Sequence, residues 1–125
     1  GNPVEESRAI KEISEAERLF VAKFTDAVNK SLESGTLDYD FIASEMCMTR
    51  SHLNRKLKAI TGLTSTDHIK AIRISLAKTL LDTTDMKVES IALRCGVDDM
   101  AYFSSLFRKA TGMTPTAWRT RCRRA

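Results

Sequence analysis

The stretch that decides the fold is Thr49–Thr64, which reads TRSHLNRKLKAITGLT. As a helix, it places Leu53, Leu57 and Ile60 on one side at intervals of three or four residues, a pattern typical of a helix with one buried face. The opposite side carries the polar residues Ser51, Asn54, Arg55 and Lys58. Asparagine and arginine pair bidentately with adenine and guanine edges in a DNA major groove, and lysine suits phosphate. The stretch therefore predicts a helix that reads DNA.

The residues just before this stretch predict a shorter helix and a tight turn. Leu37-Asp38 is a hydrophobic residue followed by an N-cap, and Ile42 is placed to pack back against the leucine. A helix is therefore expected from Asp38 to about Met46. Only the turn Met46–Met48 then separates it from the next helix, and a connection of this length is typical of a helix-turn-helix.

Sequence signals for the starts and ends of helices also occur before and after this pair of helices, and no strand pattern occurs. A capping box at Ser14–Glu17 predicts a first helix that ends at Ser34-Gly35, with the inward residues Phe20, Phe24, Ala27, Val28 and Leu32. A long helix is expected after Thr64, capped near Ser65 or Thr66, with the inward residues Ile69, Ile72, Leu76, Ala77 and Leu80. The first of these two helices is interpreted as scaffold and the second as a connection.

Three more helices complete the pattern. Val88–Cys95 predicts a short helix that ends at Gly96, a residue that adopts positive φ without penalty. Asp99 then caps a helix whose inward residues are Phe103, Phe107 and Ala110. Finally, Thr114-Pro115 is an N-cap followed by proline at the first helical position, and it predicts a last helix around Trp118.

An internal repeat is the strongest evidence in the sequence. A shift of 50 residues superposes Thr61–Thr64 (TGLT) on Thr111–Thr114 (TGMT), and it places Leu53, Leu57 and Lys58 on Phe103, Phe107 and Arg108. Upstream, Ile42-Ala43 matches Ile91-Ala92 at a shift of 49. The sequence thus predicts an all-α fold in which two helix-turn-helix units are joined by one long connecting helix.

Composition favours a small soluble domain. The 125 residues, 42% of them apolar, fit one compact domain or two very small ones. The three cysteines, Cys47, Cys95 and Cys122, are widely spaced and argue against a disulfide framework and against a zinc site. No apolar run approaches the roughly 20 residues that cross a bilayer, and no leader pattern opens the chain, so a cytoplasmic setting without membrane contact is expected.

Charge is unevenly distributed along the chain. Residues 1–48 contain 5 Lys and Arg against 10 Asp and Glu, whereas residues 49–125 contain 15 against 6, which gives net charges of −5 and +9. The basic portion begins where the proposed DNA-reading helix begins. Basic charge alone is weak evidence for nucleic-acid binding, and its coincidence with this helix strengthens the interpretation.

Catalysis, cofactors and metals find no support in the sequence. The chain lacks a phosphate-binding glycine loop, a zinc-hydrolase histidine pair and a strand-borne nucleophile. His52 follows Cys47 across a helix start, which is poor geometry for a shared metal ion. The chain is therefore predicted not to be an enzyme and to need neither a cofactor nor a metal.

The residues resemble the AraC-type transcription regulators. The resemblance rests on the repeat, on Arg73, Leu76, Ala77, Leu80 and Leu81 in the connecting helix, and on Tyr102–Ser104, Leu106–Lys109 and Thr111–Pro115 in the second unit. The helix before the first unit and the run Arg55–Gly62 are most similar to C-terminal output domains of hybrid two-component regulators. The resemblance covers roughly Leu19–Arg121, with residues 1–13 interpreted as a linker or an appended segment that precedes the domain at 14–125.

The resemblance implies sequence-specific binding of double-stranded promoter DNA, with one helix of each unit in successive major grooves. It divides the domain into a first unit with its preceding helix (14–64), a connecting helix (65–83) and a second unit (86–121). The implied DNA-binding residues are Arg50, Ser51, Asn54, Arg55 and Lys58 in the first unit and Met100, Ala101, Ser104, Ser105 and Arg108 in the second. RNA polymerase is the implied further partner, and a homodimer could form through regions outside this chain.

The two implied binding faces are unequal. Ala101, Ser104 and Ser105 occupy the places that match Ser51, Asn54 and Arg55, and none has a long forked side chain. We therefore expect the first unit to supply most hydrogen-bonded base readout. The second unit is expected to contribute phosphate contacts through Arg108, apolar contacts with thymine methyl groups and shape readout.

Several residues depart from the family pattern or carry two interpretations. Cys47 stands where the family commonly has Gly or Asn, which predicts backbone strain if the position is left-handed. Val97 and Met100 replace an aromatic residue and a proline. The basic residues Lys70, Arg73, Arg119, Arg121, Arg123 and Arg124 suit either phosphate contact or a solvated surface, and they are left outside the predicted site. The alternative function is a helical protein-interaction module whose basic face binds an acidic partner.

Overall fold

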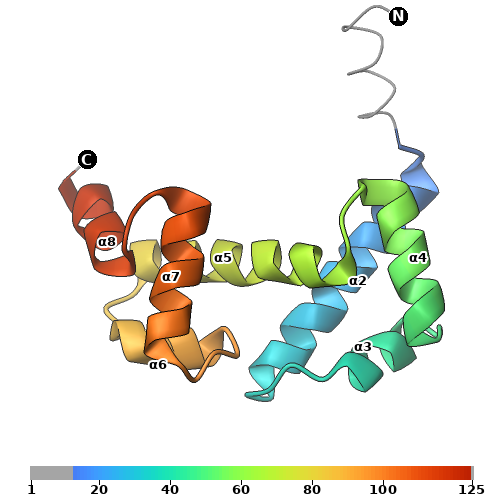
Figure 1. The fold of residues 1–125 in the computed structure, drawn as a ribbon, viewed down its shortest axis with the longest axis horizontal. Coiled ribbons are helices and arrows are strands. Elements are labelled where there is room, and N and C mark those ends of the chain that lie inside the picture. Colours follow the sequence, from blue (N-terminus) through green and yellow to red (C-terminus); the bar gives the residue numbers. More distant parts are fainter. Residues whose placement is uncertain (1–12, 125) are drawn as a thin grey trace, which may run out of the picture.

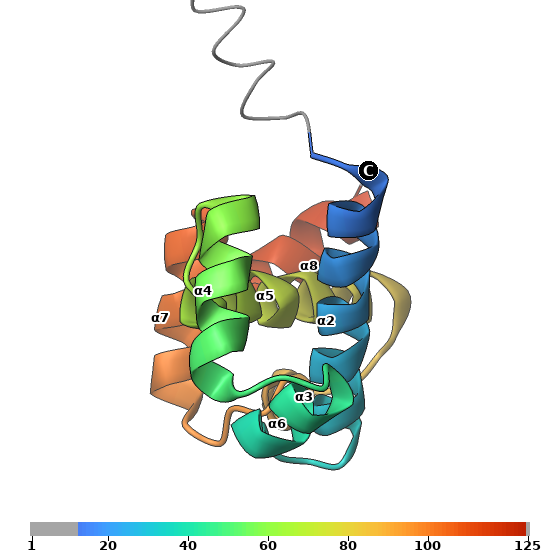
Figure 2. The same ribbon diagram turned by 90° about the vertical axis from the view of Figure 1, so that its right-hand side faces the viewer.

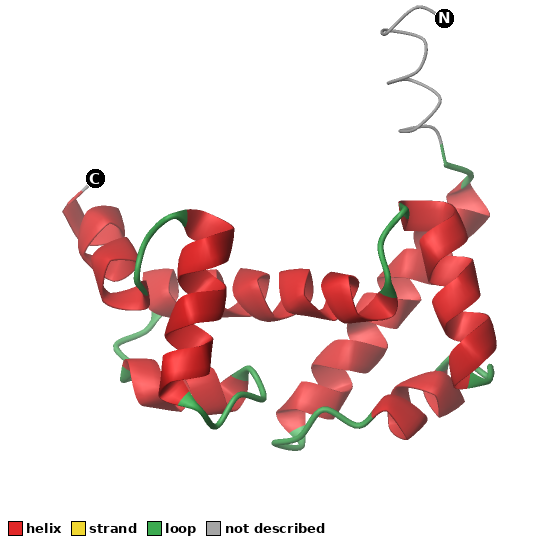
Figure 3. Cartoon of the chain, in the orientation of Figure 1, coloured by secondary structure: helices red, strands yellow, loops and turns green. Residues whose placement is uncertain are grey.

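The computed structural model describes residues 13–124, and all regular structure in this range is helical. The seven helices are α2 (Glu15–Glu33), α3 (Tyr39–Glu45), α4 (Arg50–Thr61), α5 (Ser65–Thr83), α6 (Val88–Arg94), α7 (Met100–Thr111) and α8 (Pro115–Arg124). Figure 3 shows them joined by short loops. The predicted all-α fold of about seven helices is confirmed, and the predicted N-terminal linker lies almost wholly outside the described residues.

Side chains at four predicted N-caps hold the first turns of their helices. Ser14 and Glu17 form the capping box of α2: the amide of Glu17 donates to Ser14 Oγ at 3.1 Å, and the amide of Ser14 donates to Glu17 Oε1 at 3.0 Å. Asp38, Thr49 and Asp99 likewise accept backbone amides at the starts of α3, α4 and α7. Local sequence therefore fixes where these helices begin.

The start predicted for the long helix is one or two residues too late. Thr64, rather than Ser65 or Thr66, is its N-cap, since Thr64 Oγ1 accepts the amide of Asp67 at 3.1 Å. Gly62 ends α4 in the left-handed conformation, so the chain turns early enough for Thr64 to take the cap position.

Helix α5 contributes to two separate hydrophobic cores. The first core lies between α2, α3, α4 and the beginning of α5, which supplies Ile69 and Ile72. The second lies between α6, α7, α8 and the later part of α5, which supplies Ile74, Ala77 and Leu81. The long helix is thus a structural member of both units.

This double role explains an omission in the predicted inward face of α5. Ile74 and Leu81 are 6% and 0% exposed, yet they fall outside the single amphipathic stripe expected from the sequence. The predicted stripe is divided between the cores: Ile69 and Ile72 pack in the first, whereas Ala77 and Leu80 pack in the second. Ile74 and Leu81 add a further stripe that faces the second core. Leu76 packs against both cores.

Two of the residues predicted to face inward lie at the ends of α4 and α7 and are less buried than expected. Ala110 is exposed and Ile60 is half-buried. They are equivalent in the repeat, each in the last turn of its helix before the glycine that ends it. Their helical phase is correct, but the last turn of α4 and of α7 extends past the edge of the packed core.

The two TGLT and TGMT turns adopt the same hydrogen-bonded structure. Thr61 Oγ1 donates to Leu57 O at 2.8 Å and accepts the amide of Leu63 at 3.1 Å. The second copy repeats these bonds at 2.9 Å and 3.2 Å, with Thr111 as the hydroxyl residue. The repeat seen in the sequence is therefore a repeat of backbone structure.

The two helix-turn-helix turns also share one backbone path. The amides of Cys47 and Met48 donate to Ser44 O and Ala43 O, each at 3.0 Å, and the equivalent bonds recur after α6 at 2.9 Å. The residue at the centre is Cys47 in the first unit, with φ of 56°, and Gly96 in the second, with φ of 78°. The predicted left-handed strain at Cys47 is therefore present.

The helices form two compact groups linked by α5, which runs across Figure 1 from one group to the other. Helices α4 and α7 run in the same direction at opposite ends of α5 (Figure 1). Seen along the long axis of the molecule, α4 and α7 lie on the same side of α5, with α2 on the other side (Figure 2). No described helix is long and apolar enough to cross a membrane.

Replacing Cys47 with glycine should stabilise the domain. A left-handed backbone destabilises a residue that has a Cβ by roughly 1 to 2 kcal/mol. Glycine removes this strain, but its greater conformational freedom in the unfolded chain offsets part of the stabilisation. We expect Cys47→Gly to raise the free energy of unfolding by about 1 kcal/mol, measured by urea denaturation. Cys47→Ser keeps the Cβ and should leave it unchanged, so an equal gain in both variants would contradict the strain argument.

Candidate nucleic-acid interface

The predicted reading face of α4 lies open to solvent. Leu53 and Leu57 are 4% and 0% exposed and anchor the helix on the first core. The opposite face presents Ser51, Asn54, Arg55 and Lys58, all of them exposed. Among residues 13–124, these four side chains form no hydrogen bond or ion pair, so their polar groups are available to a ligand.

Arg50, at the start of α4, differs from these four. Its guanidinium lies 5.0 Å from the centre of the Tyr39 ring, and Nη1 lies 3.8 Å from Asp40 Oδ1. Both partners belong to the first turn of α3. Arg50 therefore links the two helices of the first unit and presents its charge at their junction.

The predicted face of α7 has shorter and less accessible side chains. Ala101, Ser105 and Arg108 are exposed, Ser104 is half-buried, and Met100 is half-buried against the second core. Phe103 and Phe107, at 1% and 0% exposed, anchor this helix as Leu53 and Leu57 anchor α4. Arg108 is thus the one long cationic side chain in the predicted set on α7.

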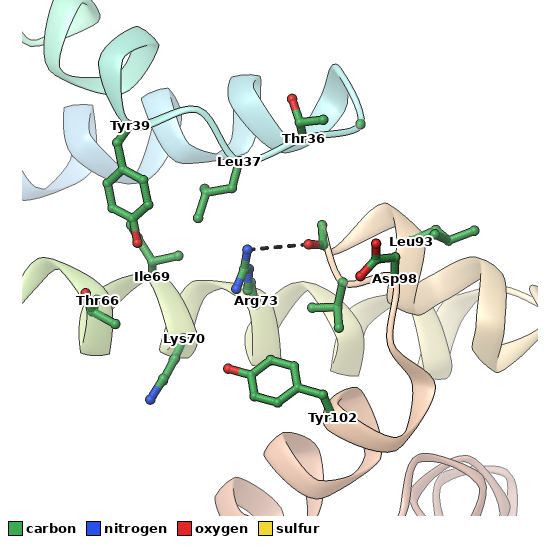
Figure 4. A pocket seen from close by; sticks show the side chains of 13 residues that line it. Thr36, Leu37, Tyr39, Thr66, Ile69, Lys70, Arg73, Leu93, Asp98 and Tyr102 are labelled. Carbon is green, nitrogen blue, oxygen red and sulfur yellow. Dashed lines mark hydrogen bonds between the residues drawn. The ribbon is translucent and has the colours of Figure 1, made fainter.

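Tyr102 is an exposed residue that the predicted site omits. It is 47% exposed and follows Ala101 on α7, at the position that His52 occupies on α4. Its hydroxyl points toward the stretch of α5 that carries Lys70 (Figure 4). In the sequence, Tyr102 can be noticed because it is a large aromatic residue directly after the predicted contact Ala101, at the repeat position of His52.

The basic C-terminal residues hold the second unit together. Arg119 donates to three backbone carbonyls: Nε to Leu81 at 3.2 Å, Nη1 to Met86 at 2.7 Å and Nη2 to Thr84 at 3.1 Å. These acceptors include carbonyl groups that α5 leaves unpaired where it ends. Arg119 therefore fastens α8 to the end of α5, a structural role that neither interpretation of the basic tail anticipated.

Neighbouring residues of α8 strengthen the same joint. Arg123 Nη2 donates to Asp85 Oδ1 at 2.8 Å and holds the pKa of that carboxyl below its ordinary value. Trp118 meets the ring of Phe107 edge to face at 5.9 Å and donates from Nε1 to Asp82 Oδ1 at 2.9 Å. The predicted core role of the tryptophan agrees with this packing.

Cys95 and His68 are held in packed surroundings, whereas Cys47 and His52 are exposed. Burial raises the pKa of the Cys95 thiol to about 11, which keeps it protonated and unreactive. Burial also lowers the pKa of His68, whose ring meets Phe24 edge to face at 5.3 Å. Within residues 13–124, no three histidine, cysteine or acidic side chains cluster as a metal site would require.

Comparison with known proteins agrees with the fold and its duplicated units. A family model described as a helix-turn-helix domain, of the AraC type, matches residues 42–121, which is more than half of the chain. The chain belongs to the AraC-type helix-turn-helix family. The matched range begins within α3 and contains α4, the connecting helix and the second unit.

The AraC-type domain is similar to part of longer curated proteins. It is 36% identical over 103 residues to the HTH-type transcriptional activator RhaR of Enterobacter sp. (strain 638), covering 82% of this chain and 36% of that protein. The RhaR protein of Mannheimia succiniciproducens is 35% identical over 117 residues, covering 94% of this chain and 40% of that protein. The chain thus spans little more than a third of these relatives.

Solved structures share the architecture of this AraC-type domain. The C-terminal domain of AraT, a response regulator from Geobacillus stearothermophilus, has a TM-score of 0.69 at 28% identity over 81% of this chain and 84% of that one. The DNA-binding domain of AdpA, solved with a target DNA, has a TM-score of 0.69 at 25% identity, over 89% of this chain and 96% of that one. An AraC-type regulator from Chromobacterium violaceum supports the fold, with a TM-score of 0.76 at 24% identity over 87% and 96%.

The Arg119 joint should be essential to stability. Arg119→Ala leaves the carbonyls of Leu81 and Met86 without their charged donor, whereas Thr84 O keeps its bond from Arg123 Nη2 at 2.9 Å. We expect the free energy of unfolding to fall by about 2 kcal/mol or more, measured by urea denaturation. Arg121→Ala is the matched control, because Arg121 is exposed and its guanidinium contacts Met113 Sδ at 4.0 Å. It should change stability by no more than about 0.5 kcal/mol. Equal losses in both variants would contradict the assigned role of Arg119.

Proposed function

We propose that this AraC-type domain binds double-stranded DNA sequence-specifically in transcription regulation, with α4 and α7 in successive major grooves. The observation that carries the proposal is the duplicated helix-turn-helix unit, whose two exposed helices lie on one side of α5 and point the same way. The 19 residues of α5 span about 28 Å at 1.5 Å per residue. This length is comparable with the helical repeat of about 34 Å that separates successive major grooves on one face of DNA.

Similarity to the DNA-binding domain of AdpA, which was solved with its target DNA, supports this function. That domain and this chain match over nearly their whole lengths. Curated relatives described as transcriptional activators support the regulatory part of the proposal. Similarity to the C-terminal domains of two response regulators, AraT and YesN, supports a further proposal that the chain is the output domain of a two-component system.

Base readout in this proposal depends mainly on α4. Arg55 reaches the O6 and N7 atoms of guanine, and Asn54 reaches the N6 and N7 atoms of adenine, each pair contributing roughly 1 to 3 kcal/mol of discrimination. Lys58 contacts phosphate, Ser51 contacts the backbone or a neighbouring base, and Arg50 contacts phosphate at the junction with α3. All five residues are exposed, and all except Arg50 have no hydrogen-bond or ion-pair partner among residues 13–124, which suits this role.

Readout by α7 depends more on shape than on hydrogen bonds. Ala101 offers a methyl group to thymine, Ser104 and Ser105 offer short hydroxyls, and Arg108 offers its charge to phosphate. Met100, half-buried against the second core, contributes an apolar edge at the start of the helix. The second half-site should therefore tolerate more base changes than the first.

Wider roles follow from the same proposal. A cytoplasmic transcription regulator of this kind acts by recruiting or stabilising RNA polymerase at a promoter. A homodimer through regions outside this chain would place two copies of the domain on neighbouring operator sites. Each role requires the full-length protein, of which the curated relatives indicate that this chain is about a third.

A salt titration separates DNA binding from the alternative, a helical module that binds an acidic protein through its basic face. Binding to a promoter duplex should weaken linearly on a log–log plot, with about one unit of slope for each phosphate that the domain neutralises. Lys58→Ala should lower the slope by about one unit and leave the sequence preference unchanged. Absence of binding to any duplex selected from a random pool, with the fold intact, would favour the protein-interaction module.

Single-base variants of the selected operator test the unequal readout. We expect substitutions in the half-site of α4 to cost roughly 1 to 3 kcal/mol each and those in the half-site of α7 to cost less, measured by competition binding. Arg55→Ala should abolish discrimination at one base position, whereas Ser105→Ala, at the equivalent position of α7, should leave every position nearly unchanged. Equal or greater sensitivity in the half-site of α7 would contradict this assignment.

A further inference from the structure

The two helix-turn-helix units meet at a point where one residue has no side chain. Gly96 lies in the turn between α6 and α7, and a Cβ placed on it would lie 2.8 Å from Leu32 Cδ2. Leu32, 1% exposed, belongs to the last turns of α2 and to the core of the first unit. A residue with a Cβ at position 96 would therefore require Leu32 or the turn itself to move.

Arg73 of α5 completes this contact. Its Nη2 donates to Gly96 O at 3.5 Å, as Figure 4 shows, and the same atom would lie 3.5 Å from a Cβ on Gly96. Its Nε is buried and has no hydrogen-bond partner among residues 13–124. Because one of its buried N–H groups has no hydrogen-bond partner, the guanidinium is held in place by the side chains packed around it. Through its bond to Gly96 O, Arg73 links the turn of the second unit to α5.

A groove of about 530 Å³ borders the contact and has one wall from each unit (Figure 4). Leu37 and Tyr39 line it from the loop and helix after α2, whereas Asp98 and Tyr102 line it from the turn and start of α7. The hydrophobic cores of the two units are separate clusters on either side. Beside this groove, the units are held by the contact of Leu32, Arg73 and Gly96 rather than by a continuous apolar interface.

We propose that this three-residue contact sets the orientation of α7 relative to α4, and with it the spacing between the half-sites that the domain recognises. Gly96 is followed within a few residues by Asp99, which caps α7 through the amide of Tyr102 at 3.0 Å. A displacement of the turn at Gly96 is therefore passed directly to the start of the reading helix. The proposal rests on the proposed DNA binding and names Arg73, Gly96 and Leu32 as positioning residues that do not touch DNA.

Operators with altered spacing test the proposal. An operator selected by the wild-type domain is compared with duplexes that have one base pair inserted or deleted between the half-sites, which rotates one half-site against the other by about 35°. The wild-type domain should lose about tenfold or more in affinity on either duplex. Arg73→Met keeps the aliphatic stem and removes the guanidinium, so this penalty should shrink to about threefold or less.

Two further measurements separate a positioning role from a general loss of stability. Binding of Arg73→Met to a duplex with the second half-site scrambled should equal that of the wild type, because α4 is unchanged. Gly96→Ala should weaken binding to the selected operator at least about fivefold more than Gly112→Ala. The two glycines have φ of 78° and 81°, but a Cβ on Gly112 meets nothing within 4 Å, so the pair differs in the inter-unit contact.

The outcomes distinguish failure of this inference from failure of the proposed function. A folded Arg73→Met domain that keeps the wild-type spacing penalty overturns the inference and leaves DNA binding intact. A wild-type domain that binds no duplex overturns the proposed function itself. If Arg73→Met does not fold, Arg73→Lys and Leu32→Val are measured on the same duplexes, and an unchanged spacing penalty in both overturns the inference.

Discussion

The constraint on which the structure depends is that α5 must bury two stripes of side chains at once. Ile72 packs into the first core and Ile74 into the second, although only one residue, Arg73, separates them along the helix. A helix with one buried stripe could hold one unit and would leave the other attached by a flexible loop. Because α5 is a member of both cores, it keeps the two units adjacent, and in the proposed arrangement the contact of Leu32, Arg73 and Gly96 sets the orientation of α7 relative to α4.

Much of this fold could be predicted from local sequence, because the caps are local interactions. Ser14, Asp38, Thr49 and Asp99 each bind an amide two or three residues ahead, so a short window of sequence contains the whole interaction. The internal repeat supplied the rest of the architecture. The second stripe of α5 was beyond such reasoning, because it depends on helices that follow α5 in the chain and on how they fold back.

The candidate interface shows the same division between local and distant information. The exposed positions of Asn54 and Arg55 follow from helical periodicity alone, and the structure leaves them open. The role of Arg119 could not be read from its neighbours, since its three acceptors lie more than 30 residues earlier in the chain. Arg73 was equally ambiguous, because a polar residue on a connecting helix gives no sign of which turn it will meet.

The engagement of Arg119 and Arg123 changes how the charge of the domain should be understood. Residues 49–125 carry a formal charge of +9, but these two cations already face backbone carbonyls and the carboxylate of Asp85. DNA binding releases condensed counterions only where a free cation meets a phosphate. The number of ions released on DNA binding therefore depends on the cations that remain free to meet phosphate, and formal charge overstates it.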